Sequence, residues 1–149
     1  MDEKELSNFI NEYMEDDDFT GGIDESQIEI VQNKLDVVLP KSYKWFLINY
    51  GSGGLFGVDI LGVAKSNIAS VVIETERFRA LGLDRKLVVI ENAGEYAYCL
   101  DTDKMEQNEC PVIAWDRQTG IDEANEADNF YKFLSQRLLD AKEAWEEDF

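Results

Sequence analysis

The chain has 149 residues, of which 44% are hydrophobic, and this suits one domain around a single core and argues against a wholly disordered protein. Its 32 acidic and 14 basic residues give a net charge of −18, which repels phosphate and argues against a protein that binds nucleic acids or anionic membranes. Histidine is absent, which excludes the catalytic mechanisms and zinc sites that need an imidazole.

The N-terminal third of the chain shows helical periodicity. Apolar residues from Leu6 to Met14 recur at intervals of three and four, which predicts a first helix that ends and frays at the acidic run 16–18. Asp24 and Gln27 have the spacing of a capping box and predict the start of a second helix. Pro40 suits the first turn of a third helix, because its missing N–H would have no partner there.

Four glycines between residues 51 and 57 follow this third helix and overlap an apolar run from Leu55 to Leu61. A phosphate-binding loop needs the opposite order, with a strand before the glycines and a helix N-terminus after them. Here the glycines follow the carbonyl end of a helix, and the Lys-Ser/Thr pair of a P-loop is absent. We therefore predict that Gly51 ends the helix in a left-handed conformation and that the apolar run is a strand.

The second half of the chain alternates between helical and strand patterns. Ser66 or Asn67 can cap a fourth helix that Gly82 closes, and residues 87–90 and 96–100 flank a turn sequence typical of an antiparallel hairpin. Residues 111–115 predict a further strand, and residues 130–145 keep helical spacing to the end. This order predicts a single α+β domain over residues 1–149, with N-terminal helices, a mainly antiparallel central sheet with an inserted helix, and a long C-terminal helix.

Several blocks of this sequence match the pattern of a known family. They are Leu39-Pro40-x-Ser42-Tyr43 with its trailing glycines, then residues 94–101, 111–116 and 127–134. From about residue 20 to residue 149 the chain resembles the SUKH superfamily, which includes a yeast cell-wall-assembly regulator and many bacterial immunity proteins; residues 1–20 form an N-terminal helix and acidic turn before the match. Arg117 departs from the pattern, since the family often has histidine there.

The resemblance implies a non-enzymatic immunity protein that neutralises a toxin of the same bacterium, often a nuclease. The charge agrees, because a compact polyanion suits the basic groove of a nuclease and would associate with it quickly. The expected partner is therefore a basic cognate toxin domain, blocked by stoichiometric occlusion without cofactor or metal. The alternative is a regulatory scaffold in cell-wall synthesis, and an acid-based hydrolase ranks well below both. The sequence leaves the toxin and the oligomeric state open.

The expected location is the cytoplasm. The first eighteen residues are acidic without a continuous apolar run, and no segment approaches the length that spans a bilayer. Cys99 and Cys110 lack CxxC spacing, and we expect both to be reduced.

We expect the toxin-facing surface at the hairpin ends of the sheet. The acidic termini carry more charge, but they lie where helices fray, and ordering a flexible surface on binding lowers the affinity. A pair of acids at strand ends is also compatible with glycosidase-type chemistry, although solvated loop-tip acids are the simpler interpretation. No catalytic residue is expected. The expected partner-binding residues are Glu91, Glu95, Asp101 and Asp116, with a partly exposed Trp45 as an aromatic anchor.

Overall fold

The computed structural model describes residues 1–94, 96–116 and 118–148 and shows an α+β fold. Four helices come first, followed by an antiparallel sheet in the order β1-β2-β3-β4 and a closing helix, so the predicted fold class is confirmed. The elements are α1 (Glu3–Tyr13), α2 (Glu25–Leu35), α3 (Lys41–Asn49), α4 (Ser70–Ala80), β1 (Leu87–Asn92), β2 (Tyr96–Asp101), a short 3-10 turn (Thr102–Lys104), β3 (Val112–Asp116), β4 (Gly120–Ala127) and α5 (Phe130–Asp148).

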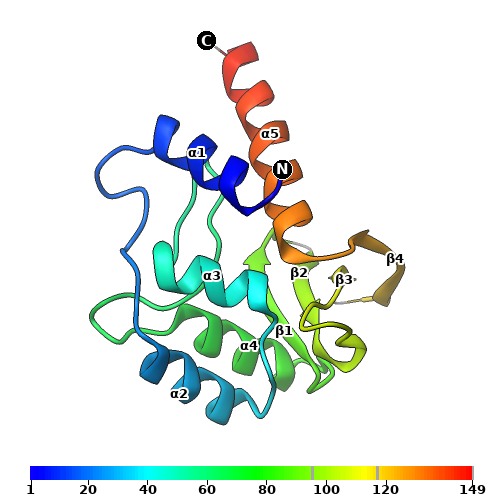
Figure 1. Cartoon of the computed structure of the whole chain (residues 1–149). Helices are drawn as coiled ribbons and strands as arrows, with labels where there is room; N and C mark the ends of the chain where they lie inside the picture. The colour runs from blue at the N-terminus through cyan, green and yellow to red at the C-terminus, as the bar shows by residue number, and fades with distance from the viewer. Residues whose placement is uncertain (95, 117, 149) are drawn as a thin grey trace.

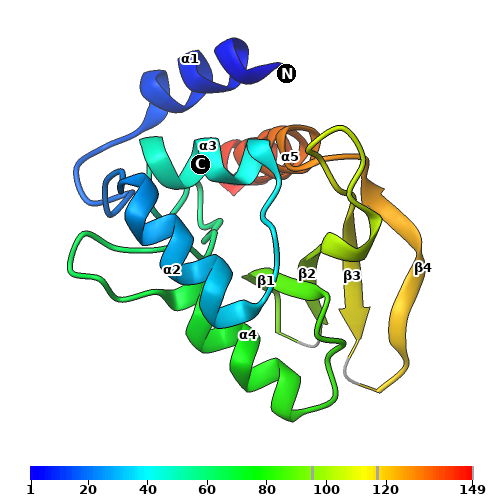
Figure 2. The ribbon, with the colours of Figure 1, turned by 60° about the horizontal axis from the view of Figure 1, so that its bottom comes forward.

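The helices enclose one core against the sheet. α4 packs beside β1, α2 packs on both α3 and α4, and α5 contacts α3 and β4. α1 is the outermost helix and packs on α5, which projects beyond the rest of the molecule (Figure 1). Figure 2 shows the sheet to one side of the helices, with α5 seen along its axis beside α3. The core therefore lies between the sheet and α3, α4 and α5.

Local sequence signals place several helix ends as predicted. Asp24 caps α2, since its carboxylate accepts the N–H of Gln27 at 3.0 Å while the Gln27 side chain accepts the N–H of Asp24 at 3.2 Å. Gly51 has φ +76° and donates its N–H to the carbonyls of Phe46 and Leu47, so it ends α3 as predicted. A Cβ at this position would lie 2.1 Å from the oxygen of Gly21, so the close approach of two backbones also requires glycine.

The predicted strand from Leu55 to Leu61 is wrong. The segment turns at residues 55–58, where the N–H of Val58 reaches the oxygen of Leu55 at 3.0 Å, and comes back to pair Ile60 with Gly53. Phe56 adopts a left-handed conformation in this turn. Leu55, Val58 and Ile60 are all buried, so the apolar pattern reports burial in a folded loop and not an extended strand.

The start of α4 and the presence of strand β4 also differ from the sequence prediction. α4 begins at Ser70, because Asn67 lies in a turn before it with φ +68° and accepts a hydrogen bond from the side chain of Gln27 at 2.7 Å. Strand β4 was not predicted, since its sequence GIDEANEA has only weak apolar alternation. An edge strand paired on one side with β3 does not need such a pattern. Cys99 and Cys110 are buried and form no disulfide with each other.

Tyr43 ties α3 to the loop after the glycines. Its ring is fully buried, and its hydroxyl donates to the carbonyl of Leu61 at 2.7 Å. Burial raises the pKa of this phenol well above its ordinary value, so the hydroxyl stays a donor.

We expect Tyr43→Phe to lower the free energy of unfolding by about 1–2 kcal/mol, because the Leu61 carbonyl would lose its partner in the core. Urea denaturation with an unchanged m-value is the measurement. Tyr96→Phe, on an exposed ring, is the control and should change stability much less. Equal losses in the two variants would contradict the assigned bond.

Candidate functional site

Glu91 is an internal residue and not a solvated loop-tip acid. Its side chain is only 7% exposed, and its carboxylate accepts two hydrogen bonds from Arg137 on α5, at 2.8 Å from Nε and 2.6 Å from Nη2. The guanidinium also lies over the ring of Tyr98, 5.6 Å from its centroid. Glu91 thus joins β1 to α5, and the expectation of a solvent-facing acid here is corrected.

Asp101 and Asp116 lie at opposite ends of the sheet. Asp101 pairs with Leu87 at the start of β1, whereas Asp116 pairs with residue 96 at the other end of β2. Asp101 is buried, and its carboxylate forms an ion pair with Lys104 at 3.7 Å. The carboxylate of Asp116 accepts the N–H groups of Gln118 and Thr119 at 2.7 and 3.2 Å, and these bonds lower its pKa. Glu95 lies outside the described residues.

Trp45 is not the exposed anchor that its position off the apolar stripe suggested. The residue is 9% exposed, and its ring packs against those of Tyr50 at 5.7 Å and Tyr131 at 5.3 Å. Tyr131 belongs to α5, so the packing of α5 on α3 buries the indole. The four described residues of the expected surface, Trp45, Glu91, Asp101 and Asp116, therefore do not form one exposed face.

A groove at the end of α1 brings acids and partly exposed aromatic rings together. It encloses about 440 Å³ between the last turn of α1, the loop after the glycines and the end of α5. Three of its lining residues carry carboxylates and none is basic. Tyr13 is 37% exposed and Trp145 is 48% exposed, so both rings form part of the surface. We call this the α1–α5 groove; its lining residues are Glu12, Tyr13, Met14, Glu15, Asp18, Leu55, Phe56 and Trp145.

Ring contacts join the three segments of the groove. Phe56 sits between the helices, with its centroid 5.7 Å from Tyr13 of α1 and 5.5 Å from Trp145 of α5. Phe9 supports Tyr13 from within α1 at 5.0 Å. Each pair lies in the range of favourable aromatic contacts. The loop brings Phe56 to this place because its glycines allow the reversal at residues 51–57.

The acidic run after α1 is held by hydrogen bonds and does not fray as expected. The carboxylate of Asp18 accepts the N–H of Glu15 at 2.7 Å, and the carbonyl of Asp18 accepts the N–H of Gly54 at 3.2 Å. Thr20 adds a backbone bond to Ser52 at 3.0 Å. α5 likewise stays helical to Asp148. The acidic run is therefore joined to the glycine loop by hydrogen bonds.

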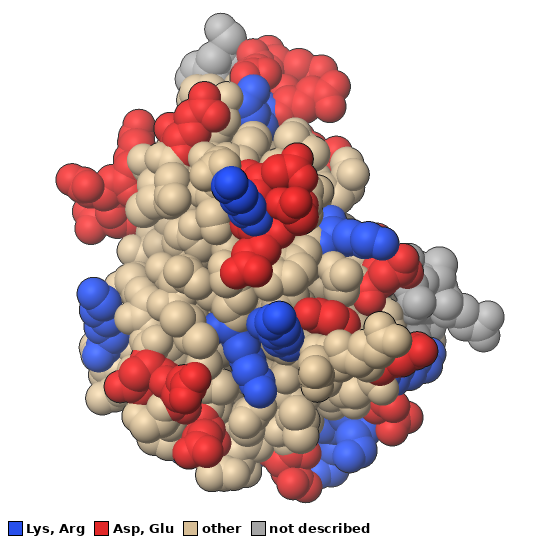
Figure 3. All heavy atoms as spheres, viewed as in Figure 1, with Lys and Arg blue, Asp and Glu red and all other residues tan. Residues whose placement is uncertain are grey.

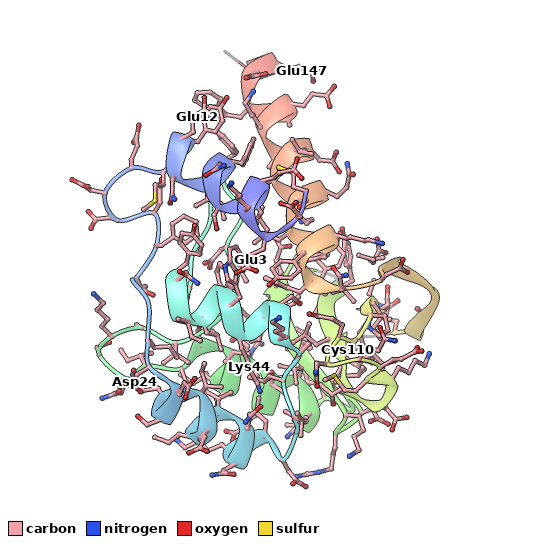
Figure 4. The ribbon with its side chains drawn as sticks, in the orientation of Figure 1. Glu3, Glu12, Asp24, Lys44, Cys110 and Glu147 are labelled. Carbon is pink, nitrogen blue, oxygen red and sulfur yellow. The ribbon has the colours of Figure 1, made fainter. Side chains whose placement is uncertain are left out.

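The acids near the groove stand where they oppose helix stability. Neither α1 nor α5 has a basic residue in its last turn, while Glu12 and Glu147 lie at those C-terminal ends, where the helix dipole is negative. Both glutamates lie at the same end of the molecule (Figure 4). The stability of these helices therefore does not explain such acids.

The charge is unevenly distributed along the chain and over the surface. Residues 1–20 carry eight acids and one base, whereas residues 21–94 carry nine acids and eight bases. On the face in Figure 3, acidic side chains gather over α1 and the end of α5, and most of the basic ones lie lower, over α2 to α4. The segments that line the α1–α5 groove, α1 and the end of α5, are therefore the more acidic ones on this face.

Two other cavities of the described residues include a basic side chain in their walls. One of about 660 Å³ beside the end of α2 is lined by Lys86 together with the acids Asp36 and Glu106. A smaller one of about 200 Å³ between α2 and α4 includes Lys34 and no acid. Among the described residues no group of three or more Cys, Asp or Glu side chains is arranged to hold a metal ion. None of the described helices is long and apolar enough to cross a membrane.

Comparison with known families agrees with the observed fold. The SUKH_5 family, described as SMI1-KNR4 cell-wall, matches residues 6–139, from within α1 to within α5. The chain belongs to this family. A crystal structure of a protein from Pseudomonas syringae pv. tomato has the same fold as this SUKH_5 chain, with a TM-score of 0.68 and 20% identity over 90% of this chain and 95% of that one. SUKH proteins are generally non-enzymatic.

The SUKH_5 match covers only part of the groove. Tyr13 and Phe56 lie within the matched residues, while Trp145 and the acids after it lie beyond residue 139. The sequence pattern assigned these three aromatic residues to two helices and a strand, and gave none of them a role in binding a partner. A usable signal was present, since Tyr13 ends one apolar stripe, Trp145 ends another, and both stripes run into acids at a helix C-terminus.

Proposed function

We propose that the protein is an immunity protein that binds a cognate toxin domain one-to-one and neutralises it by occlusion, without turnover. Membership of the SUKH superfamily is compatible with this role. The observation that carries the proposal is the α1–α5 groove, because an open aromatic surface is lined by three carboxylates and no base. The proposed partner surface is basic, as expected for a toxin domain that acts on phosphate-containing substrates.

The groove combines two properties that favour a tight complex. Its acids attract a basic surface from a distance and speed association. Its exposed rings, Tyr13 and Trp145, are residue types that contribute strongly to binding once they are covered. Because hydrogen bonds and ring contacts already order the groove, little ordering is needed on binding. The interface we propose therefore lies at the α1–α5 groove and not at the hairpin ends.

Co-expression with a toxin domain encoded beside the gene tests the proposal. Growth should be rescued, and the purified mixture should form a one-to-one complex in analytical ultracentrifugation. In a titration, the remaining toxin activity should fall linearly and reach zero at one equivalent. Continued killing by a folded, equally expressed protein would exclude neutralisation, and complete inactivation by much less than one equivalent would indicate an enzyme.

The family description favours a second candidate function, a regulatory scaffold in cell-wall synthesis. A deletion strain separates the two candidates. A scaffold predicts sensitivity to wall-active antibiotics in the absence of any toxin, whereas an immunity protein predicts normal growth until the toxin is delivered.

A further inference from the structure

A basic side chain of the protein already rests on the aromatic surface beside the groove. Lys142 of α5 places its Nζ over the ring of Tyr13, 5.3 Å from the centroid, and forms an ion pair with Glu146 one turn later. The carboxylate of Glu146, and to a lesser degree Tyr13, raises the pKa of Lys142. The ring of Tyr13 therefore binds an ammonium group in the free protein.

Two acids that line the groove, Glu12 and Glu15, are available to a cation of a partner. Among the described residues, the cations of α5 form ion pairs with Asp128, Glu91 and Glu146, and none pairs with Glu12 or Glu15. Both of these glutamates are exposed. Lys142 also keeps its own counter-ion if it leaves the ring, because Glu146 stands on the same helix. Displacement of Lys142 from Tyr13 would thus leave no charge unpaired.

We infer that the α1–α5 groove receives a lysine or arginine side chain of a basic protein partner, and that this side chain replaces Lys142 on the ring of Tyr13. The inference rests on the proposed function for the place of binding but not for the identity of the toxin. Lys142 is then an internal competitor, which lowers the affinity for the partner by occupying the cation position on the ring until the partner arrives.

A purely structural role for Lys142 gives a different expectation. Its side chain is 22% exposed and bridges α1 and α5, so a brace between the helices is the competing interpretation. A brace would make removal of the ammonium group weaken both stability and binding. A competitor would make the same change strengthen binding.

The test uses a hexa-arginine peptide as the probe and the full chain, labelled with ¹⁵N. Lys142→Met removes the ammonium group and keeps most of the stem, and it should bind the peptide about 3–10-fold more tightly than the wild type. Lys132→Met is the matched control, since it makes the same charge change on α5 at an exposed site paired with Asp128. The control should gain less than about twofold, because only long-range charge changes.

Further variants and one NMR signal test whether the effect arises at the ring of Tyr13. Tyr13→Leu should bind the peptide about 3–10-fold more weakly, and adding Lys142→Met to it should give no more than the long-range gain of less than about twofold expected for Lys132→Met. The indole N–H signal of Trp145 should shift on titration, while those of the buried Trp45 and Trp115 serve as internal references. Lys142→Arg, which keeps a cation on the ring, should not gain affinity. Thermal unfolding of each variant checks that α1 remains packed on α5.

Equal gains for Lys142→Met and Lys132→Met, a full gain of about 3–10-fold that persists in Tyr13→Leu, or an unmoved Trp145 signal would overturn the inference. The outcome is separable from that of the proposed function. If the wild type neutralises the toxin but Lys142→Met brings no gain over Lys132→Met, the competitor is refuted and the immunity role stands. If the peptide results hold and no toxin is neutralised, the groove remains a receptor for basic side chains and the immunity role fails.

Discussion

Glu91→Gln is expected to lower the free energy of unfolding by about 2–4 kcal/mol, a large share of the stability of a domain of this size. The substitution leaves the guanidinium of Arg137 without its counter-charge at a place where the acid is 7% exposed and the arginine 30% exposed. The partial exposure of Arg137 reduces the loss below that of a fully buried pair. Chemical denaturation at neutral pH measures the change in the free energy of unfolding.

The matched controls separate the pair from the charge itself. Glu76→Gln makes the same charge change on the exposed face of α4 and should shift stability by less than about 0.5 kcal/mol. Glu91→Gln/Arg137→Gln should recover part of the loss, because no unpaired charge remains. The folded fraction of Glu91→Gln should bind the toxin as the wild type does. A Glu91→Gln variant with unchanged stability and weaker toxin binding would show that Glu91 belongs to the binding surface.

Structural features that depend on residues close together in the chain were predictable from the sequence. The capping pair at Asp24 and Gln27 acts across three residues, and Gly51 ends α3 because of its own backbone freedom. The hairpin β1–β2 and the stripe of α5 likewise depend on local periodicity. These local features, in chain order, were sufficient for the fold class.

The candidate site depended on contacts between distant residues, and the sequence could not supply them. From the sequence, Glu91 was interpreted as an acid at a strand end, because its partner Arg137 lies 46 residues away on α5. Trp45 was interpreted as partly exposed, because the sequence does not show that Tyr131 of α5 packs against it. The α1–α5 groove needs the turn at Phe56, where an apolar run was interpreted as a strand. In each case the missing information was the position of α5 or of the loop relative to the helices.

Charge reversal at the groove, Glu12→Lys/Glu15→Lys, is expected to weaken toxin binding about 10–100-fold, mainly through slower association. The pair changes the charge next to Tyr13 from attractive to repulsive for a basic partner. Stability should hold or rise by about 0.3–1 kcal/mol, because Glu12 leaves the negative end of the α1 dipole. Stopped-flow association with the cognate toxin domain is the measurement, together with thermal unfolding.

The control is Glu29→Lys/Glu76→Lys, which makes the same change in net charge at exposed positions of α2 and α4. Because both double variants alter the long-range field equally, only local contact distinguishes them. The control should associate within about threefold of the wild type. The difference should shrink as salt rises toward 0.5 M, since screening acts over about 4–10 Å in this range. An equal effect of the two pairs at every salt concentration would show that the net charge acts as a whole, and it would remove the α1–α5 groove as the binding surface.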